Sequence, residues 1–292
     1  MTTPLDQART LRQIASTSDK DGVIALDKPR ARALAVTGGK GGVGKSTIAL
    51  NLAVSYARRG AKTLAVDGDL GMADLNLLLG LAPEKSLLDV LNGSPVEESV
   101  ISAHGLDLLP ALNGSHRLAN LDANDRAKLF DAIGGLLPSY DTLVIDTPAG
   151  IGETAMALAG AAVDVVVVTT PEPLSLADAY ACMKILATRH NLQRAFILPN
   201  SVRSPSQAEE VVSRLRALVD RFLGIEIVAL AAVPWDANIA QAAAAGVPLV
   251  LHSPESPASR AIRRAARQLD ALAGSLPALS NTLQLRQVGV AK

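Results

Sequence analysis

The sequence predicts an α/β fold, a doubly wound and mainly parallel sheet with helices on both faces. Short aliphatic runs, several of which end in a polar residue, alternate with stretches of helical spacing along the 292 residues. Leu, Val, Ile and Ala dominate and aromatic residues make up only 2%, which suits strands buried on both faces. A glycine cluster also separates the first predicted strand from the first predicted helix, as a ligand-binding turn of such a sheet would.

The first strand and helix enclose this glycine-rich loop within Ala33 to Thr47. Residues Gly39 to Ser46 fit the eight-residue phosphate-loop pattern. In such a loop, backbone N–H groups surround the phosphates, a lysine neutralises the β and γ oxygens, and a hydroxyl ligates Mg²⁺. A glycine-rich turn with a stray lysine is the alternative. The predicted nucleotide contacts of the loop are Gly39, Lys40, Gly41, Gly42, Val43, Gly44, Lys45, Ser46 and Thr47.

Two later strands are predicted to end in carboxylates. Lys62 to Asp67 leads into Asp69, and Thr142 to Asp146 is an apolar run that ends in an aspartate. Ligands of doubly wound sheets lie at the carboxyl ends of the strands, so these side chains should face the phosphates. One carboxylate there can orient the attacking water and another can hold Mg²⁺, usually through water. Strand-end caps and turns are the structural alternative.

Lys40 is a second lysine within the loop, which an ordinary phosphate loop does not need. It lies too early to duplicate Lys45, but it could reach the phosphates of a facing subunit. The run from Lys40 to Ser46 resembles the deviant phosphate-loop family that includes MinD, ParA, the nitrogenase iron protein and FlhG (also called FleN). The resemblance implies ATP and Mg²⁺ as cofactors and an ATP-dependent homodimer in which Lys40 contacts nucleotide across the interface.

The same resemblance implies a role for each remaining candidate residue. Asp69 corresponds to the catalytic carboxylate that positions water, beside the catalytic lysines Lys40 and Lys45. Asn200, at the end of a predicted strand from Ala195, and Pro234 are placed where relatives contact adenine. The implied metal residues are Ser46, Asp67 and Asp146.

Other segments are similar to the FlhG group within this family. Thr169 to Pro173 and Asp178 to Tyr180 resemble it and differ from ParA proteins. Asp74 and Asn76 occur in the reverse of the usual order, so neither is assigned a role. The segment Asp6 to Arg12 is similar to an FlhG element that contacts and stimulates the GTPase FlhF.

The sequence thus predicts a slow switch ATPase that regulates flagellar number or placement. Its expected partners are an FlhF-like GTPase, flagellar switch proteins or a flagellar transcription activator. Three segments are expected: a flexible arm over residues 1–32 with a candidate partner-binding helix, a P-loop ATPase domain over 33–274, and a tail over 275–292. A ParA/MinD-type positioning or DNA-partition ATPase remains the main alternative, and a metal carrier or biosynthetic ligase on the same scaffold is another.

Composition bears on these alternatives. A formal net charge of zero argues against a broad basic surface for DNA. A single cysteine, Cys182, excludes a four-thiolate cluster within one chain and is expected to be a small buried residue. No apolar run predicts a transmembrane helix or secretory signal, so the expected location is the cytoplasm. The arginine-rich helix from Ala258 is expected to pack on the sheet, while lipid binding at the inner face of the membrane stays open.

Overall fold

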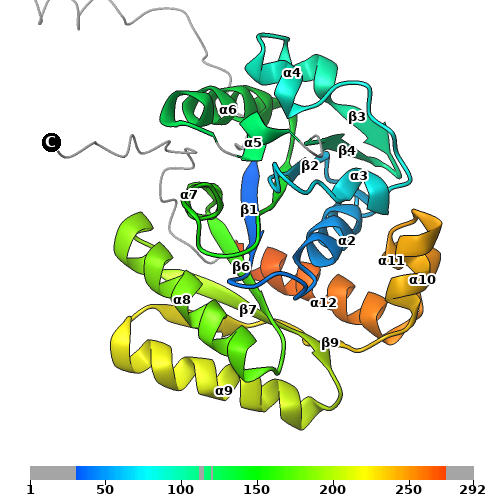
Figure 1. Cartoon of the computed structure of the whole chain (residues 1–292). Coiled ribbons are helices and arrows are strands. Elements are labelled where there is room, and N and C mark those ends of the chain that lie inside the picture. Colours follow the sequence, from blue (N-terminus) through cyan, green and yellow to red (C-terminus); the bar gives the residue numbers. More distant parts are fainter. Residues whose placement is uncertain (1–30, 112–114, 120, 274–292) are drawn as a thin grey trace, which may run out of the picture.

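A nine-stranded sheet forms the centre of the structure, a computed structural model that describes residues 31–111, 115–119 and 121–273 (Figure 1). The strand order is β3-β4-β2-β5-β1-β6-β7-β8, and β9 pairs with β7 beyond the end of β8. The strands are β1 (Arg32–Thr37), β2 (Thr63–Asp67), β3 (Ile101–Ala103), β4 (Leu106–Leu109), β5 (Thr142–Asp146), β6 (Asp164–Thr169), β7 (Arg194–Val202), β8 (Glu226–Ala229) and β9 (Val233–Pro234).

Strand pairing is parallel throughout the described sheet except between β3 and β4. In the register of the central strands, Val36 and Asp67 both lie opposite Asp146. Parallel pairing therefore brings the carboxyl ends of β1, β2 and β5 to one edge of the sheet, where ligands of this architecture bind.

Helices cover both faces of the sheet, which confirms the predicted doubly wound α/β fold. Alternate residues of β1 point to opposite faces, as in any strand: Leu34 packs with α2 and α12, whereas Ala35 packs with α7, α8 and α9. The helices are α2 (Lys45–Ala57), α3 (Leu75–Leu78), α4 (Leu87–Leu91), α5 (His116–Ala119), α6 (Ala123–Leu136), α7 (Glu153–Ala161), α8 (Pro173–His190), α9 (Pro205–Phe222), α10 (Asn238–Ala245), α11 (Leu249–His252) and α12 (Pro257–Ala273), with 3₁₀ turns η1 (Val96–Ser99) and η2 (Leu137–Ser139).

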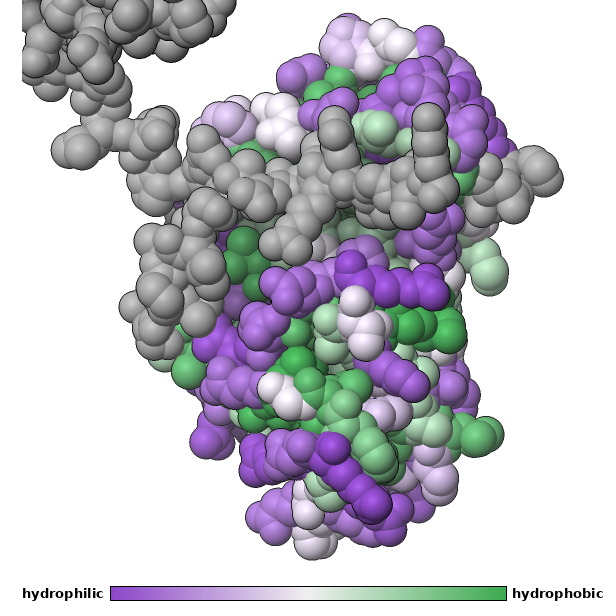
Figure 2. All heavy atoms as spheres, turned by 90° about the vertical axis from the view of Figure 1, so that its left-hand side faces the viewer, coloured by the Kyte–Doolittle hydropathy of each residue, from purple (hydrophilic) through white to green (hydrophobic). Residues whose placement is uncertain are grey.

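Helix α12 packs on the sheet, as predicted, through a fully buried apolar stripe. Ile262 and Leu269 are buried, whereas Arg260, Arg264 and Arg267 are exposed. On the face shown in Figure 2, polar side chains surround smaller groups of apolar ones. No helix in the described part of the chain has the length and apolar character needed to cross a bilayer.

The structure differs from the sequence-based prediction in three places. β1 begins at Arg32, one residue before the predicted boundary, because Arg32 already pairs with Thr142 of β5 and donates its N–H to the Asp141 carbonyl (3.0 Å). The helical spacing of Val96 to Ile101 predicts a short helix, but only the turn η1 forms there and β3 begins at Ile101. The apolar run from Ile225 to Val233 predicts one strand, but the structure contains β8 and β9 instead. The candidate partner helix at Asp6 to Arg12 and the tail from residue 275 lie outside the described residues.

Candidate nucleotide site

Residues 38–44 form a tight loop between β1 and α2. Gly42 and Gly44 have φ angles of 76° and 94°, a backbone conformation that glycine adopts at no steric cost. A Cβ atom on Gly39 would lie 2.1 Å from the carbonyl oxygen of Asp178 on α8. Side chains at Gly39 or Gly44 would therefore push the loop away from its neighbours, which explains why glycine occupies these positions.

The N-terminal end of α2 is open for an anion. Gly44 is its N-cap and supplies no side-chain cap, and the first turn holds no acidic residue. The first N–H groups of a helix have no partner within it, and the helix dipole places positive charge at the same end. A phosphate group satisfies both requirements.

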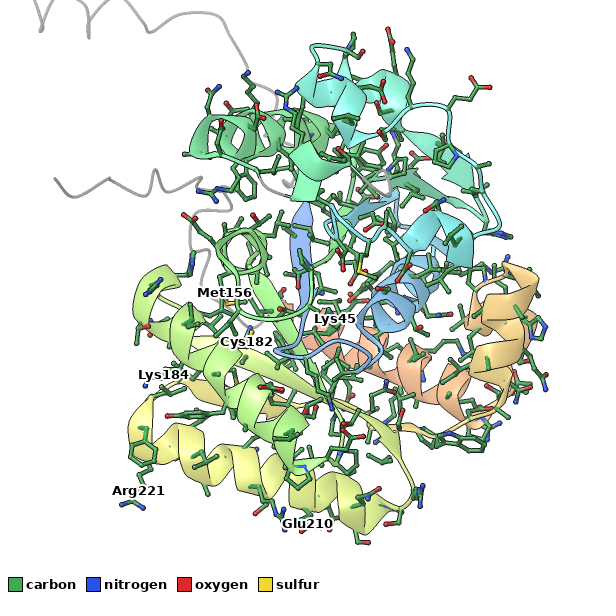
Figure 3. The ribbon with its side chains drawn as sticks, viewed as in Figure 1. Lys45, Met156, Cys182, Lys184, Glu210 and Arg221 are labelled. Carbon is green, nitrogen blue, oxygen red and sulfur yellow. The ribbon has the colours of Figure 1, made fainter. Side chains whose placement is uncertain are left out.

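Lys45, in the first turn of α2, is a nearly buried cation. Its exposed fraction is only 7%, and the described residues offer it neither an ion pair nor a hydrogen bond. Figure 3 shows Lys45 at the centre of the molecule, where the loop meets α2. Because a buried charge without a partner is costly, Lys45 is suited to an anionic ligand.

Asp146 lies opposite this cation at the end of β5. Its side chain is 1% exposed, and neither carboxylate oxygen has a hydrogen-bond partner among the described residues. Burial raises the pKa of Asp146 well above its ordinary value; the Ser46 hydroxyl and Lys45 oppose the rise, and Asp67 and Asp69 add to it. Two unsatisfied oxygens beside a hydroxyl fit a hydrated Mg²⁺ ion, which prefers oxygen ligands and retains several waters.

Asp67 is also buried, but its oxygens are occupied. One accepts a hydrogen bond from the Asp69 N–H (3.2 Å) and the other from the Leu75 N–H (3.1 Å). Burial raises the pKa of Asp67 to about 7, although these two backbone hydrogen bonds oppose the rise. The arrangement suits the predicted supporting part in the metal shell, because Asp67 fixes the backbone that carries Asp69.

We expect the raised pKa of Asp67 to appear in the pH dependence of stability. A folded-state pKa of about 7, against 3.8 for the free group, means that the native state binds the extra proton between these values. The free energy of unfolding of the nucleotide-free protein should therefore fall as pH rises from about 4 to 7, by on the order of 4 kcal/mol from this group.

Urea unfolding of wild-type protein and Asp67→Asn between pH 4 and 8 measures this contribution. The variant loses a hydrogen-bond acceptor as well as the titrating group, which offsets its stability from that of wild type, so the slope against pH is the quantity compared. A shallower fall with pH in Asp67→Asn is expected, and equal slopes in the two proteins would assign the titration to other groups.

Asp69 and Asp74 occupy the segment between β2 and α3. The Oδ1 atom of Asp69 accepts a hydrogen bond from the Met72 N–H (3.2 Å), and its side chain is half-buried. Asp74 is exposed, and partial burial of its carboxyl and the charge of Asp69 raise its pKa. Both carboxylates therefore lie at the edge of the site that faces solvent, where an attacking water can enter.

Asn200 lies directly against the phosphate loop. Its Nδ2 donates a hydrogen bond to the Val43 carbonyl (2.8 Å), whereas its buried Oδ1 has no partner among the described residues. Val233 and Pro234 of β9 pair with the end of β7 beside it. One of the two N–H donors of Asn200 is used by Val43, and its free Oδ1 is an acceptor that suits the amino group of adenine. Trp235, the only tryptophan of the sequence, follows Pro234 and is 68% exposed.

Lys40 lies at the outer end of the loop, apart from Lys45. Its Nζ is 2.7 Å from Oε2 of Glu172, and the two side chains are 38% and 65% exposed. Sequence reasoning did not single out this pairing, because the two residues are 132 positions apart. Glu172 lies in the segment from Thr169 to Pro173, which resembles the FlhG group. The sequence therefore indicated the motif but not its contact with Lys40.

The structure therefore brings the predicted phosphate, metal and water-positioning residues to one edge of the sheet. A separate groove of about 1080 Å³ lies between α9 and α12, and of the predicted site residues only Pro234 lines it. Cys182 is fully buried on α8, 3.7 Å from the Thr37 hydroxyl, and burial raises its pKa to about 11. The predicted role of Cys182 as a small buried residue is confirmed.

Comparisons with known proteins agree with this site. A family model described as ParA, NUBPL iron-transfer P-loop NTPase, matches residues 30–270. The antiactivator FleN of Pseudomonas aeruginosa is 34% identical over 239 residues, 81% of this chain and 85% of FleN. The flagellum site-determining protein YlxH of Helicobacter pylori is 37% identical over 191 residues, 65% of this chain and 64% of YlxH.

A solved structure extends the comparison to a bound nucleotide. The septum site-determining protein MinD from Pyrococcus horikoshii, in complex with Mg-ADP, aligns with a TM-score of 0.70 and 30% identity over 84% of this chain and 98% of that one. ATP and Mg²⁺ are accordingly the cofactors that the family implies, and the open helix end, Lys45 and Asp146 fit them. The chain belongs to the ParA/MinD family of P-loop NTPases.

Proposed function

We propose that this protein is a slow ATPase that dimerises around two ATP·Mg²⁺ and returns to monomers after hydrolysis. The position of Lys40 carries this proposal. Its ammonium group lies at the exposed rim of the loop, paired with Glu172, while Lys45 alone lies inside. Exposed ion pairs contribute only about 0 to 1 kcal/mol, so the phosphates of a facing subunit can replace Glu172 as the partner of Lys40.

Exposed apolar side chains near the same edge support a contact face. Met72 and Leu174 are 72% and 71% exposed, and Ile151 is 48% exposed. Met72 lies three residues after Asp69, Ile151 follows the turn after β5, and Leu174 lies in the first turn of α8, two residues after Glu172. Large exposed apolar side chains grouped around a ligand site are typical of protein interfaces.

Within one subunit, each residue has a defined part in phosphoryl transfer to water. The loop N–H groups and Lys45 hold the phosphate oxygens, and Ser46 and Asp146 are placed to hold Mg²⁺, which neutralises developing charge when bound. Asp69 orients a water whose oxygen bonds to the γ-phosphorus as the bond to the ADP oxygen breaks. Lys40 of a second subunit adds positive charge at the place where negative charge develops on the leaving oxygen.

We further propose that the switch regulates flagellar number or placement. The similarity to FleN and YlxH supports this role, and the segment from Asp6 to Arg12 is the proposed contact for an FlhF-like GTPase. Flagellar switch proteins and a flagellar transcription activator are further proposed partners, and the cytoplasm, including the inner face of the cell membrane, is the proposed place of action. A ParA/MinD-type positioning or partition ATPase would use the same site with a different partner.

The description of the matching family model includes iron transfer, and this gives a second candidate function. The chain has one cysteine, which is buried, and the described residues hold no group of three or more His, Cys, Asp or Glu side chains arranged for a metal. A carrier built on this chain would need thiolates from a second copy, and buried Cys182 is poorly placed for that. The switch proposal therefore fits the site better.

Solution mass in the presence of a non-hydrolysable ATP analogue and Mg²⁺ tests the switch. Wild-type protein should be a dimer with the analogue and a monomer with ADP, and Lys40→Ala should bind the analogue but stay monomeric. Glu172→Gln is the matched control, because it breaks the same intrachain ion pair but keeps the lysine. If Glu172→Gln loses the dimer as Lys40→Ala does, the intrachain pair and not a contact across the interface is what dimerisation requires.

A further inference from the structure

The groove between α9 and α12 lies along the open edge of the sheet. β8 is the last strand in the order, so one of its sides has no neighbouring strand. Successive turns of α9 form one wall, two turns of α12 form the other, and the chain from Ala229 to Ala232 forms the floor. Figure 1 shows α9 and α12 on opposite faces of the sheet at this end.

The floor of the groove retains unpaired backbone groups. Glu226 and Leu230 donate their N–H groups to β7 at 2.9 Å, and since pairing alternates along a parallel strand, the groups of Ile227 and Ala229 point outward. Arg216 donates to the Ile227 carbonyl at 3.5 Å, and Gln268 accepts from the Ala231 N–H at 2.7 Å. Ala229, between them, has no hydrogen-bond partner on this side in the described structure.

Small side chains leave room above this floor. Ala208, Ser213 and Ala217 face the groove from α9 and Ala261 faces it from α12, so its volume of about 1080 Å³ is not filled by long apolar side chains. An open strand edge flanked by two helices with small residues has the shape that accepts an added strand. Proteins usually blunt such edges with charge or cover them, and here the central part of the edge is left open.

The charged side chains of the two walls indicate which kind of peptide strand would bind in the groove. Four arginines and two carboxylates line the groove: Arg203, Arg216, Arg260, Arg264, Glu209 and Asp220. None of the four arginines forms an ion pair with any described residue. Guanidinium groups bind carboxylates through paired hydrogen bonds, so an acidic extended segment matches both the floor and the walls.

A nucleic acid fits these walls less well. Single strands bind on aromatic side chains that stack with the bases, and the lining of the groove contains no aromatic residue. Glu209 and Asp220 would also face the phosphates. A nucleic acid would leave the free peptide groups of Ala229 and the apolar floor without matching contacts. A peptide can form hydrogen bonds with the former and pack apolar side chains near the latter.

We propose that this groove is a docking site for an acidic, extended peptide segment of a partner protein, which adds a strand to the free edge of β8. The segment pairs with the backbone at Ala229. Neighbouring side chains of an added strand point to opposite faces of the sheet, so adjacent carboxylates reach Arg216 on α9 and Arg264 on α12, and small apolar side chains pack beside the alanines of both helices. The groove does not include the phosphate loop and shares only Pro234 with the predicted nucleotide contacts, so peptide binding can be measured without nucleotide and separately from the ATP switch proposed above.

Fluorescence anisotropy with a labelled eight-residue peptide, in which pairs of adjacent glutamates alternate with pairs of valines, tests this proposal on the full-length protein without nucleotide. Binding of this peptide, and not of its valine-lysine counterpart, is expected. Replacing one central residue of the peptide by proline removes a backbone donor and should weaken binding about tenfold, since one hydrogen bond of about 1.4 kcal/mol is tenfold in affinity.

Charge reversal in the protein supplies the matched control. Arg216→Glu with Arg264→Glu should weaken binding of the acidic peptide by about tenfold or more. Arg214→Glu with Arg263→Glu makes the same charge change on the same two helices, outside the groove, and should leave binding intact. Equal loss in both double variants would show non-specific attraction, and binding of an oligothymidine in place of the peptide would show a nucleic-acid site; either result overturns the proposal.

Discussion

Lys45→Ala is expected to abolish binding of ATP at concentrations that saturate the wild-type protein. Lys45 is 7% exposed and forms no ion pair or hydrogen bond with the described residues, so in the free protein its charge is available for the phosphates. A charge-assisted hydrogen bond contributes about 1.5 to 3 kcal/mol, and the lysine serves more than one phosphate oxygen. We therefore expect the affinity for ATP to fall by at least about 100-fold.

Thermal unfolding with and without ATP·Mg²⁺ separates this loss from misfolding. A ligand present at 100 times its dissociation constant stabilises the native state by about 2.7 kcal/mol, and Lys45→Ala should lack this gain. Without nucleotide the variant should unfold in one cooperative transition like wild type. Its own unfolding temperature is the reference for the effect of ATP, because removal of Lys45 also removes a charge that lowers the pKa of buried Asp146. Lys184→Ala is the matched control, since Lys184 is exposed on α8 and lies away from Lys45 in Figure 3.

The phosphate loop could be predicted from sequence because its requirements are local. Glycines at fixed spacing, a lysine and a hydroxyl are all contributed by one short segment, and the φ angles at Gly42 and Gly44 follow from the turn itself. The positions of Asp67 and Asp146 were predictable for a related reason. Parallel pairing of β2 with β5 sets Asp67 opposite Asp146 once the strands are assigned.

Contacts between distant segments could not be predicted in the same way. The pairing of Lys40 with Glu172 joins the first loop to the start of α8, and no periodicity links them. The end of β8 was missed because residues 225–233 form a nearly continuous apolar run. After Ala229 the chain leaves the sheet, and the Ala231 N–H donates a hydrogen bond to Gln268 on α12. The open edge and its groove depend on this contact between distant segments and could not be inferred from the sequence.

Helix α10 is held in place by a contact that no sequence pattern indicates. Two glycines approach closely there: a Cβ on Gly246 would lie 2.8 Å from the Cα of Gly80. This contact joins the end of α10 to the turn that follows α3. We expect a substitution at Gly246 to disturb the segment between Asp69 and Gly80 from outside the nucleotide site.

Asp69→Ala is expected to bind ATP and to dimerise but to lose hydrolysis. Asp69 lies at the solvent side of the site, and in the described structure its side chain accepts one hydrogen bond, from the Met72 N–H, and none from the loop. Affinity for ATP should stay within a few-fold of wild type, whereas loss of a group that positions or deprotonates water lowers the rate by about 10² to 10⁴. Phosphate release measured at saturating ATP gives this rate, and Asp69→Asn shows whether a neutral acceptor for Met72 suffices.

Asp74→Ala is the matched control for Asp69→Ala, because both carboxylates lie on the segment between β2 and α3 and Asp74 interacts electrostatically with Asp69 and Lys45. If removal of either carboxylate slows hydrolysis equally, negative charge near the phosphates and not the placement of water is what the reaction needs.

The solution mass of Asp69→Ala then connects hydrolysis to dimerisation. A lasting dimer with ATP·Mg²⁺, and a monomer with ADP, is expected because the γ-phosphate that holds both subunits is no longer removed. A monomer with ATP that still hydrolyses at the wild-type rate would contradict both the role of Asp69 and the switch.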